Sequence, residues 1–307
     1  MSEPSNNSSR HIGIEVSANA LTVVGLDASG NLLEAFHMPA APGGSVQEQI
    51  ASIATDISTK FGDIGEIGIA LPGLISSDKM RVAYSTHFPE HSSVDIKEEI
   101  VAATGRTPLI ENDANAAAYG EFKKGAGRGS KNLFYVTLGQ GIGGAFILDG
   151  KIWRGASGFA GEFGYLTINS EGLRLEDVAS AGNIVRRTRS RFNRDSTSSL
   201  NRFEEQAINL EEIVTAADNG DDFAQLMLER TGSYIGVGVA SVINLMNIET
   251  IVVGGEIMQA GHLVLDSIIR RAKELSFAPS FAQTTIASGQ LGPNAAAVGV
   301  ALLASGL

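Results

Sequence analysis

A single acidic residue at the start of a predicted helix is the first candidate for chemistry in this sequence. The stretch Ile110-Glu-Asn-Asp-Ala-Asn-Ala-Ala-Ala118 places Asp113 where an apolar strand over 108–111 ends and a helix over 112–123 begins. Asp113 either caps this helix, as Asn and Asp commonly do, or acts as a general base. A helix N-terminus keeps a carboxylate ionised, and an ionised carboxylate can take the proton of a substrate hydroxyl. The spacing alone leaves both interpretations open.

A run of glycines forms the second candidate. In Val136-Thr-Leu-Gly-Gln-Gly-Ile-Gly-Gly144, a strand over 133–138 enters a predicted turn over 139–144 and continues as a strand over 145–148. Glycines allow backbone N–H groups to approach phosphate oxygens because no Cβ intervenes. The alternative is an ordinary tight hairpin, since glycine motifs are weak signals by themselves.

Two further stretches contain candidate binding residues. Arg154-Gly-Ala-Ser-Gly-Phe-Ala-Gly-Glu-Phe-Gly-Tyr165 presents Glu162, whose carboxylate can accept hydrogen bonds from sugar hydroxyls, although a loop Glu is usually only solvated. Ile251-Val-Val-Gly-Gly-Glu256 is a strand that ends in a double glycine. This edge could hold a nucleotide or could simply turn the chain into a helix.

The order of strands and helices indicates an α/β protein. Predicted strands cover 12–16, 20–26, 32–36, 64–71, 250–253 and 284–287, and predicted helices cover 46–61, 94–104, 203–219, 223–247, 263–275 and 294–303. Residues 133–154 repeat the order seen in 12–33, namely strand, turn, strand, Asp-containing turn, strand, so one structural unit is used twice. Glycines in the helix over 223–247 indicate close packing against a neighbour. The Gly-rich segment 123–130 is predicted to be a hinge or boundary.

Composition narrows the class of protein. The 307 residues suffice for two domains. The absence of Cys excludes disulfides and thiolate metal sites. A net charge of −11 argues against a nucleic-acid partner, no apolar run reaches the ~20 residues of a membrane span, and the polar residues 1–10 are predicted to be a disordered tail rather than a signal peptide. We therefore expect a soluble, cytoplasmic protein. One short basic run is predicted to be a solvated helix face: Arg186, Arg187, Arg189, Arg191 and Arg194.

Taken together and in this order, the motifs resemble the ROK family of repressors, open reading frames and kinases. The resemblance extends from Leu71 to the C-terminus and is strongest in 110–118 and 136–165. It implies an α/β, two-domain actin-like ATPase (ribonuclease H-like) sugar kinase fold with a cleft between the domains. The smaller domain would comprise 11–120 and the terminal helix 294–307, and the larger domain 121–293.

The resemblance also implies an activity, which is ATP- and Mg²⁺-dependent phosphorylation of a hexose at O6, as in a glucokinase, by a homodimer or homotetramer. The alternatives are a kinase for an acylamino sugar of the N-acetylmannosamine type, and a sugar-binding pseudokinase or regulator. Asp113 would be the catalytic base, and Mg²⁺ would enter with the nucleotide. The other implied site residues are Asn112, Glu162, Glu176, Gly73, Tyr165 and His87 for the sugar, Glu15, Thr137, Gly139, Gly141, Gly143 and Gly144 for phosphate, and Gly254 and Gly255 for adenosine.

Three departures from the family pattern change these expectations. The first phosphate loop, usually Asp-x-Gly-Gly-Thr-Lys, is here Glu15-Val-Ser-Ala-Asn-Ala20, which is closer to the sugar-responsive regulators. Those regulators carry an N-terminal helix-turn-helix domain, whereas a ten-residue tail precedes the first strand here. Tyr165 replaces a His, and the family's Cys cluster is missing between 169 and 175, so no structural zinc is predicted. In 85–91, His87 takes the place of a sugar-contacting Asn and His91 that of a Trp; His87 either bonds a hydroxyl or is solvated.

Overall fold

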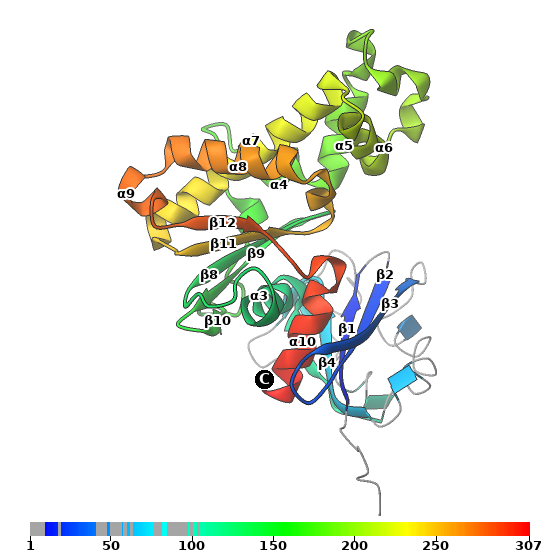
Figure 1. Cartoon of the computed structure of the whole chain (residues 1–307), viewed down its shortest axis with the longest axis vertical. Helices are drawn as coiled ribbons and strands as arrows, with labels where there is room; N and C mark the ends of the chain where they lie inside the picture. The colour runs from blue at the N-terminus through cyan, green and yellow to red at the C-terminus, as the bar shows by residue number, and fades with distance from the viewer. Residues whose placement is uncertain are drawn as a thin grey trace, which may run out of the picture. The chain divides into compact units, whose positions relative to one another are not determined.

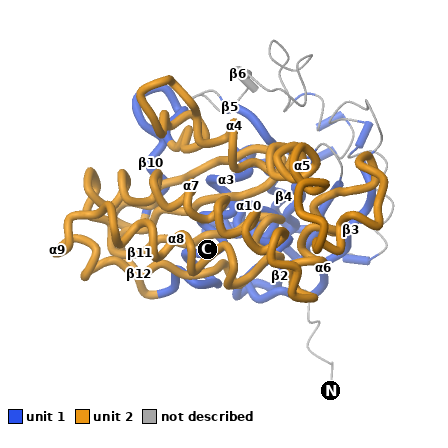
Figure 2. The backbone as a smooth tube through the Cα atoms, turned by 90° about the horizontal axis from the view of Figure 1, so that it is seen from above, with its two compact units in different colours: residues 1–128, 151–160, 291–307 blue, residues 129–150, 161–290 orange. Residues whose placement is uncertain are grey.

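The computed structural model describes residues 10–17, 20–40, 64–75, 82–84 and 105–307, and also 48, 49, 57, 60, 61, 98, 101 and 102. The chain divides into two compact units, residues 1–128, 151–160 and 291–307 in the first and residues 129–150 and 161–290 in the second (Figure 2). Of the sequence-based predictions, the tail up to residue 9, His87 and His91 lie outside the described residues, as do most of the helices over 46–61 and 94–104.

The first unit contains a five-stranded sheet of order β3-β2-β1-β4-β7 (Figure 1). Strands β1 (Arg10–Val16), β2 (Ala20–Leu26) and β3 (Leu32–Pro39) form an antiparallel meander, and β4 (Ile64–Leu71) and β7 (Leu109–Asn112) run parallel to β1. The predicted hairpin turn over 27–30 is confirmed, because the Asp27 carboxylate accepts hydrogen bonds from the backbone N–H groups of Ser29 and Asn31. Strands β5 (Leu74–Ile75) and β6 (Val82–Tyr84) form a separate small sheet.

Helices α3 (Asp113–Lys124) and α10 (Ala295–Ser305) complete the first unit. They pack so closely that a Cβ at Gly299 would lie 1.7 Å from the carbonyl oxygen of Ala116. A Cβ at Gly13 on β1 or at Gly68 on β4 would likewise meet the backbone of α10. Small residues therefore determine how near the two helices and the sheet approach.

Replacement of Gly299 by Ala tests this packing. Because the added methyl group has no space, the free energy of unfolding should fall by about 1–3 kcal/mol, the usual cost of overpacking a core. Urea unfolding measures the loss. Gly182→Ala is the matched control, since the glycine lies in a helix and a Cβ there would meet nothing within 4 Å; its stability should be unchanged or slightly higher. Equal stability of both variants would contradict the packing argument.

The second unit repeats the strand order of the first. Its sheet runs β10-β9-β8-β11-β12, with β8 (Leu133–Leu138), β9 (Ile142–Leu148) and β10 (Lys151–Trp153) as the meander, and β11 (Thr250–Gly254) and β12 (Thr285–Ser288) parallel to β8. Residues 151–160 group with the first unit although β10 is an edge strand of this sheet. The internal repeat predicted from the sequence is thus confirmed.

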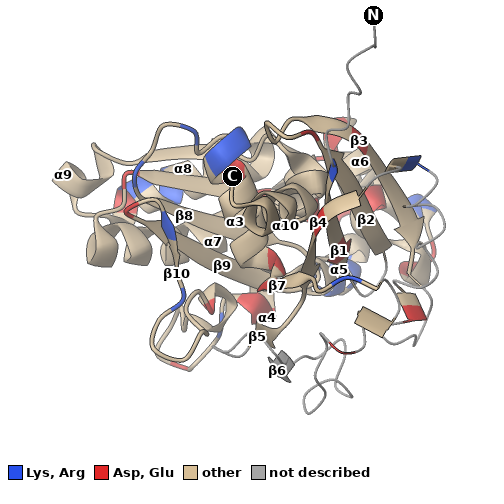
Figure 3. Cartoon of the chain, turned by 90° about the horizontal axis from the view of Figure 1, so that it is seen from below, with Lys and Arg blue, Asp and Glu red and all other residues tan. Residues whose placement is uncertain are grey.

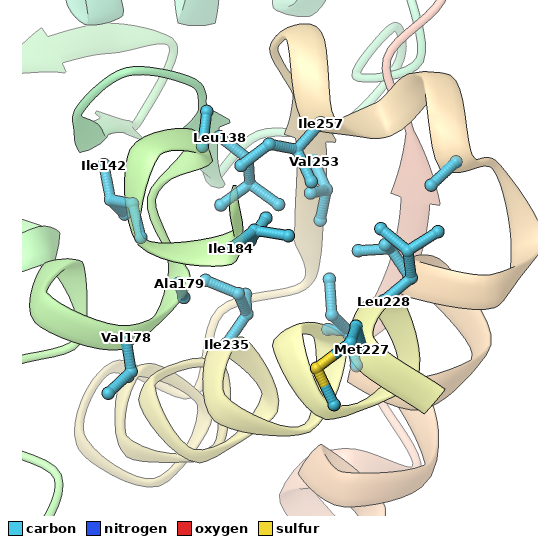
Figure 4. Packing of buried hydrophobic residues seen from close by; sticks show 14 of the residues in the cluster. Leu138, Ile142, Val178, Ala179, Ile184, Met227, Leu228, Ile235, Val253 and Ile257 are labelled. Carbon is cyan, nitrogen blue, oxygen red and sulfur yellow. The ribbon is translucent and has the colours of Figure 1, made fainter. Parts of the chain in front are cut away.

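The longest helices of the second unit pack against each other, and an apolar core lies beside them (Figures 1 and 4). Gly232 and Gly236 allow the close contact of α7 and α8, since a Cβ at either would lie within 3 Å of α8 atoms. This confirms the close packing predicted from the glycines. The helices are α4 (Glu176–Ala179), α5 (Ala181–Arg189), α6 (Leu210–Asp218), α7 (Asp222–Met246), α8 (His262–Leu275) and α9 (Ala278–Phe281).

Two sequence-based expectations for this unit are wrong. The helix predicted over 203–219 begins only at Leu210, because the Asn209 side chain accepts a hydrogen bond from the N–H of Glu212 and caps the helix there. The arginine run is not wholly solvated. Arg187 is only 8% exposed and donates to the hydroxyl of Thr231, and Arg189 donates to the carbonyl oxygens of residues 206 and 208. Within the described ranges, no helix is long and apolar enough to cross a membrane.

Candidate functional site

The first group of candidate residues lies at one edge of the first unit's sheet. Strands β1, β4 and β7 are parallel neighbours, and their register aligns Glu15 with Ala70 and Ala70 with Glu111. The C-terminal ends of parallel strands meet at one edge, where α/β proteins commonly bind ligands. Glu15, Gly73 and the pair Asn112-Asp113 are therefore brought to the same edge.

Asp113 is the first residue of α3, and Asn112 is the cap. The side-chain oxygen of Asn112 accepts a hydrogen bond from the N–H of Asn115 at 3.0 Å. The capping interpretation of Asp113 is thus wrong, because the neighbouring amide performs that role. The Oδ1 atom of Asp113 accepts from the N–H of Ala114 at 2.8 Å and from Nδ2 of Asn112 at 3.0 Å. A carboxylate in the first helical turn, held by two donors, is suited to accept a proton from a bound hydroxyl.

Gly73 fixes Asn112 from the neighbouring strand end. The Nδ2 atom of Asn112 donates to the carbonyl oxygen of Gly73 at 2.9 Å. Gly73 has a φ of +110°, which favours glycine. In this arrangement the Asn112 amide joins the turn after β4 to the start of α3. Its predicted contact with sugar stays a prediction.

Glu111, two residues before Asp113, forms an ion pair with Arg154 that the sequence analysis did not predict. Glu111 is 2% exposed, and its Oε2 atom pairs with Nη2 of Arg154 at 2.5 Å. Its Oε1 atom accepts from the N–H of Asn112 at 3.2 Å and from Nδ2 of Asn115 at 3.1 Å. The sequence contains a signal for this pair, because Glu111 lies within an apolar strand and a buried carboxylate requires a partner of opposite charge.

Glu15 is enclosed at the same edge. Burial, followed by the negative charge of Asp113, raises the pKa of Glu15 from 4.5 to about 8. The turn that follows is closed on itself, because the N–H and hydroxyl of Ser17 both donate to the carbonyl oxygen of Ala20 and the N–H of Ala20 donates to the Ser17 hydroxyl. The N–H groups of Ser17 and Ala20 are therefore occupied within the turn and do not fit a phosphate.

Glu15 should make the free energy of unfolding fall as the pH rises from about 4.5 to about 8. In that range the folded chain keeps a proton that the unfolded chain has lost, so folding is favoured fully below the range and least above it. The slope from one group is at most about 1.4 kcal/mol per pH unit. The residue keeps part of its surface exposed, so the sign of the slope is the test. Urea unfolding across this range should show a more positive slope of stability against pH in Glu15→Gln than in the unchanged chain; an unchanged slope would contradict the assignment.

The second group of candidate residues lies at the corresponding edge of the second unit's sheet. Thr137 on β8 aligns with Gly254 at the end of β11. Gly255 follows with a φ of +95°, and a Cβ there would lie 2.4 Å from the carbonyl oxygen of Leu138. The double glycine therefore allows the backbone after β11 to pack in direct contact with the end of β8.

The turn between β8 and β9 is shorter than predicted. Strand β9 begins at Ile142, so Gly143 and Gly144 are strand residues and only 139–141 form the turn. Gly144 is required for packing, since a Cβ there would lie 2.7 Å from the ring of Phe134. The exposed Gln140 and Gly141 form no backbone N–H hydrogen bond within the part of the chain that the structure describes. With these two N–H groups free, the turn fits a phosphate group.

The predicted sugar-binding carboxylates of the second unit, Glu162 and Glu176, lie close together. The Oε2 atom of Glu176 accepts from the N–H of Ile142 at 2.8 Å, beside the turn. Burial of the Glu162 carboxyl raises its pKa, and the charge of Glu176 adds to the shift. Together the two carboxylates can accept several hydrogen bonds from hydroxyl groups.

Two further contacts complete this edge. Glu256, to which the sequence reasoning gave no role, accepts a hydrogen bond from Nε2 of Gln140 at 2.9 Å and so holds the turn. Tyr165 is 54% exposed, and the guanidinium of Arg174 lies 4.5 Å from the centroid of its ring.

Among the residues that the structure describes, no group of three or more His, Asp or Glu side chains could hold a metal ion.

Comparison with known proteins places this arrangement in a family. The sequence matches the ROK family over residues 11–306. The chain belongs to the ROK family. Among its curated relatives, a glucokinase from Halalkalibacterium halodurans is 29% identical over 280 residues, which cover 84% of this chain and 83% of the relative.

ROK proteins of known structure share the fold. A glucokinase from Streptomyces griseus, solved in complex with glucose and AMPPNP, is 26% identical with a TM-score of 0.87 over 97% of this chain and 100% of the other. A ROK transcriptional regulator, a homolog of the E. coli MLC protein, is 26% identical with a TM-score of 0.85 over 98% of this chain and 78% of the other. With the two repeated sheets, these matches confirm the actin-like α/β fold. The family includes both kinases and regulators, so the site must decide between them.

Proposed function

We propose that this ROK protein is an ATP-dependent sugar kinase that phosphorylates a hexose. The observation that supports it most is Asp113, a carboxylate in the first turn of α3 whose Oδ1 atom is held by Ala114 and Asn112. The similarity to glucokinases, one of them solved with glucose and a nucleotide analogue, supports the same class of reaction. A base held in this manner is needed by an enzyme that activates a hydroxyl, whereas sugar binding alone does not require one.

In the proposed reaction, the sugar hydroxyl oxygen forms a bond to the γ-phosphorus of ATP as the bond from that phosphorus to the β,γ-bridging oxygen breaks. The hydroxyl proton passes to Asp113, and ADP carries away the electron pair of the broken bond. Glu162 and Glu176 accept hydrogen bonds from the other hydroxyls, and the N–H groups of Gln140 and Gly141 bind a phosphate. Mg²⁺, bound through the nucleotide, would supply positive charge for the transferring phosphoryl group.

Release of ADP across a panel of sugars tests this proposal. The panel contains glucose, mannose, N-acetylglucosamine and N-acetylmannosamine, each with Mg²⁺ and ATP. We expect sugar-dependent ADP release with at least one hexose, because Asp113 is held in place to accept a proton and the turn over 139–141 has free N–H groups for a phosphate. A purified, folded chain that releases no ADP with any of these sugars would overturn the kinase assignment for hexoses and their acylamino derivatives.

A sugar-binding protein without kinase activity is the second candidate, and one observation favours it. In the turn after β1, Ser17 and Ala20 hydrogen-bond to each other, so the N–H groups of these two residues are not available to a phosphate. A ligand that binds only the folded chain raises its melting temperature. A rise with sugar together with none with Mg²⁺ and ATP, in the presence or absence of that sugar, would support the binding protein and contradict the kinase.

A further inference from the structure

A pocket lies in the second unit and shares no residue with the candidate site. Its volume is about 560 Å³, within the range of small-molecule sites. One wall comes from α7, one from α8 and one from the hairpin over 166–175, which is closed by backbone hydrogen bonds between Ile168 and Leu173 and between Leu166 and Leu175. The lining residues are Ile168, Asn169, Leu173, Ser233, Tyr234, Val237, Arg270, Arg271 and Glu274.

The charged groups of this pocket favour an anion. Arg271 pairs with Glu274 at 2.8 Å, so the only carboxylate in the lining is already neutralised. Arg270 is exposed and uses Nη2 to donate to the hydroxyl of Ser267 at 3.0 Å. Its Nε and Nη1 groups have no partner among the described residues, and they remain available to a ligand.

A third arginine, Arg187, contacts the pocket wall and forms no ion pair with the acidic residues that the structure describes. Arg187 is 8% exposed, and its guanidinium lies 5.6 Å from the ring centroid of Tyr234, a lining residue. It donates to the hydroxyl of Thr231 at 2.7 Å, but its buried Nε and Nη1 atoms have no hydrogen-bond partner among the described residues. Burial first, and then the positive charges of Arg191 and Arg230, lower the pKa of Arg187 to about 10, while Tyr234 acts in the opposite direction.

Two arginines of α8, Arg270 and Arg271, line the pocket, and Arg187 of α5 contacts the lining residue Tyr234, in a chain whose net charge is −11. Figure 3 shows the basic and acidic residues along the chain. An uncompensated buried cation costs free energy, and an anion nearby reduces that cost. Arginine also matches the geometry of phosphate and carboxylate groups. The pocket further offers the hydroxyls of Ser233 and Tyr234 and the amide of Asn169, beside an apolar surface from Leu173 and Val237.

We propose that this pocket binds an anionic monosaccharide, in which a phosphate or carboxylate contacts Arg270 and the sugar body contacts the hydroxyls and the apolar wall. Anion binding follows from the pocket alone. That the ligand could be the product of the reaction rests on the proposed function, because phosphorylation of a hexose yields a sugar phosphate.

Binding is measured by isothermal titration calorimetry with glucose 6-phosphate, gluconate, glucose and inorganic phosphate as separate ligands. The background is Glu162→Gln/Glu176→Gln, which removes the predicted sugar contacts and isolates the second pocket. We expect one of the two anionic sugars to bind, more tightly than glucose or phosphate. Which anionic sugar binds distinguishes a sugar phosphate from a sugar acid.

Arg270→Met in that background should weaken binding by about tenfold or more, the value of one charge-assisted hydrogen bond. Arg202→Met, which removes an exposed arginine of the second unit outside the pocket, should leave the affinity unchanged. Melting temperatures verify that each variant is folded. Equal affinity in the Arg270 and Arg202 variants, no binding of either anionic sugar, or equally tight binding of phosphate alone would overturn the proposal. Failure of the kinase assay leaves this outcome unaffected, so the two proposals fail separately.

Discussion

Asp113→Asn should lower kcat by about 10²–10⁴-fold, the usual contribution of a general base, while the sugar dissociation constant changes only a few-fold. Asn has nearly the same shape, and its side-chain oxygen can still accept the hydrogen bond from the N–H of Ala114 that holds Asp113 now. It cannot take the proton of the sugar hydroxyl. Initial rates of ADP release give kcat, and calorimetric titration with sugar gives the dissociation constant.

Asp222→Asn is the matched control for this prediction. Asp222 is the first residue of α7, as Asp113 is of α3, and it is exposed. The same chemical change at a helix N-terminus in the second unit should leave both constants as they are. Turnover that survives in the Asp113 variant, or an equal loss in the Asp222 variant, would remove Asp113 from the mechanism.

The sequence was sufficient to predict the repeated sheet because strand order and hairpin turns depend on local alternation and turn residues. Strands β2 (Ala20–Leu26) and β4 (Ile64–Leu71) begin and end as predicted. The sequence could not predict which residue caps α3, because Asn112 and Asp113 are adjacent and both residue types cap helices. Only the backbone conformation of Asn112, with a φ of −65° and a ψ of 143°, selects between them.

Contacts between distant residues explain the remaining errors. Gly144 was expected in the turn but is a strand residue, and a Cβ there would meet the side chains of Phe134 and Phe163. Arg187 looked solvated, but its partner Thr231 lies 44 positions away. No local pattern in the sequence contains information on such distant pairs, so the contacts that hold the candidate residues could not be predicted.

The two equivalent turns differ in which of their described backbone N–H groups are free. The turn after β1 is closed by Ser17 and follows a buried carboxylate, Glu15, whereas the turn after β8 exposes the N–H groups of Gln140 and Gly141. Nucleotide phosphate should therefore depend mainly on the second turn. The first unit would contribute the base, Asp113. The position of Asp113 would depend on the ion pair between Glu111 and Arg154.

Arg154→Met should lower the free energy of unfolding by about 3–5 kcal/mol, the cost of leaving a buried charge without its partner. Glu111, only 2% exposed, would keep its charge in the strand that leads into Asn112 and Asp113. We expect kcat to fall as well, because the same carboxylate positions the N–H of Asn112 and the side chain of Asn115. Urea unfolding and ADP release measure the two effects.

The double variant Glu111→Gln/Arg154→Met identifies the cause of that loss. It removes the orphaned charge and keeps an amide oxygen for Asn112 and Asn115, so it should recover most of the lost stability. Lys131→Met breaks an exposed pair, Lys131 with Asp149 at 2.8 Å, and should leave stability nearly unchanged. A double variant no more stable than Arg154→Met would show that lost packing of the arginine stem, rather than the unpaired carboxylate, carries the cost. In that case Arg154 would support the loop after β10 without positioning Asp113.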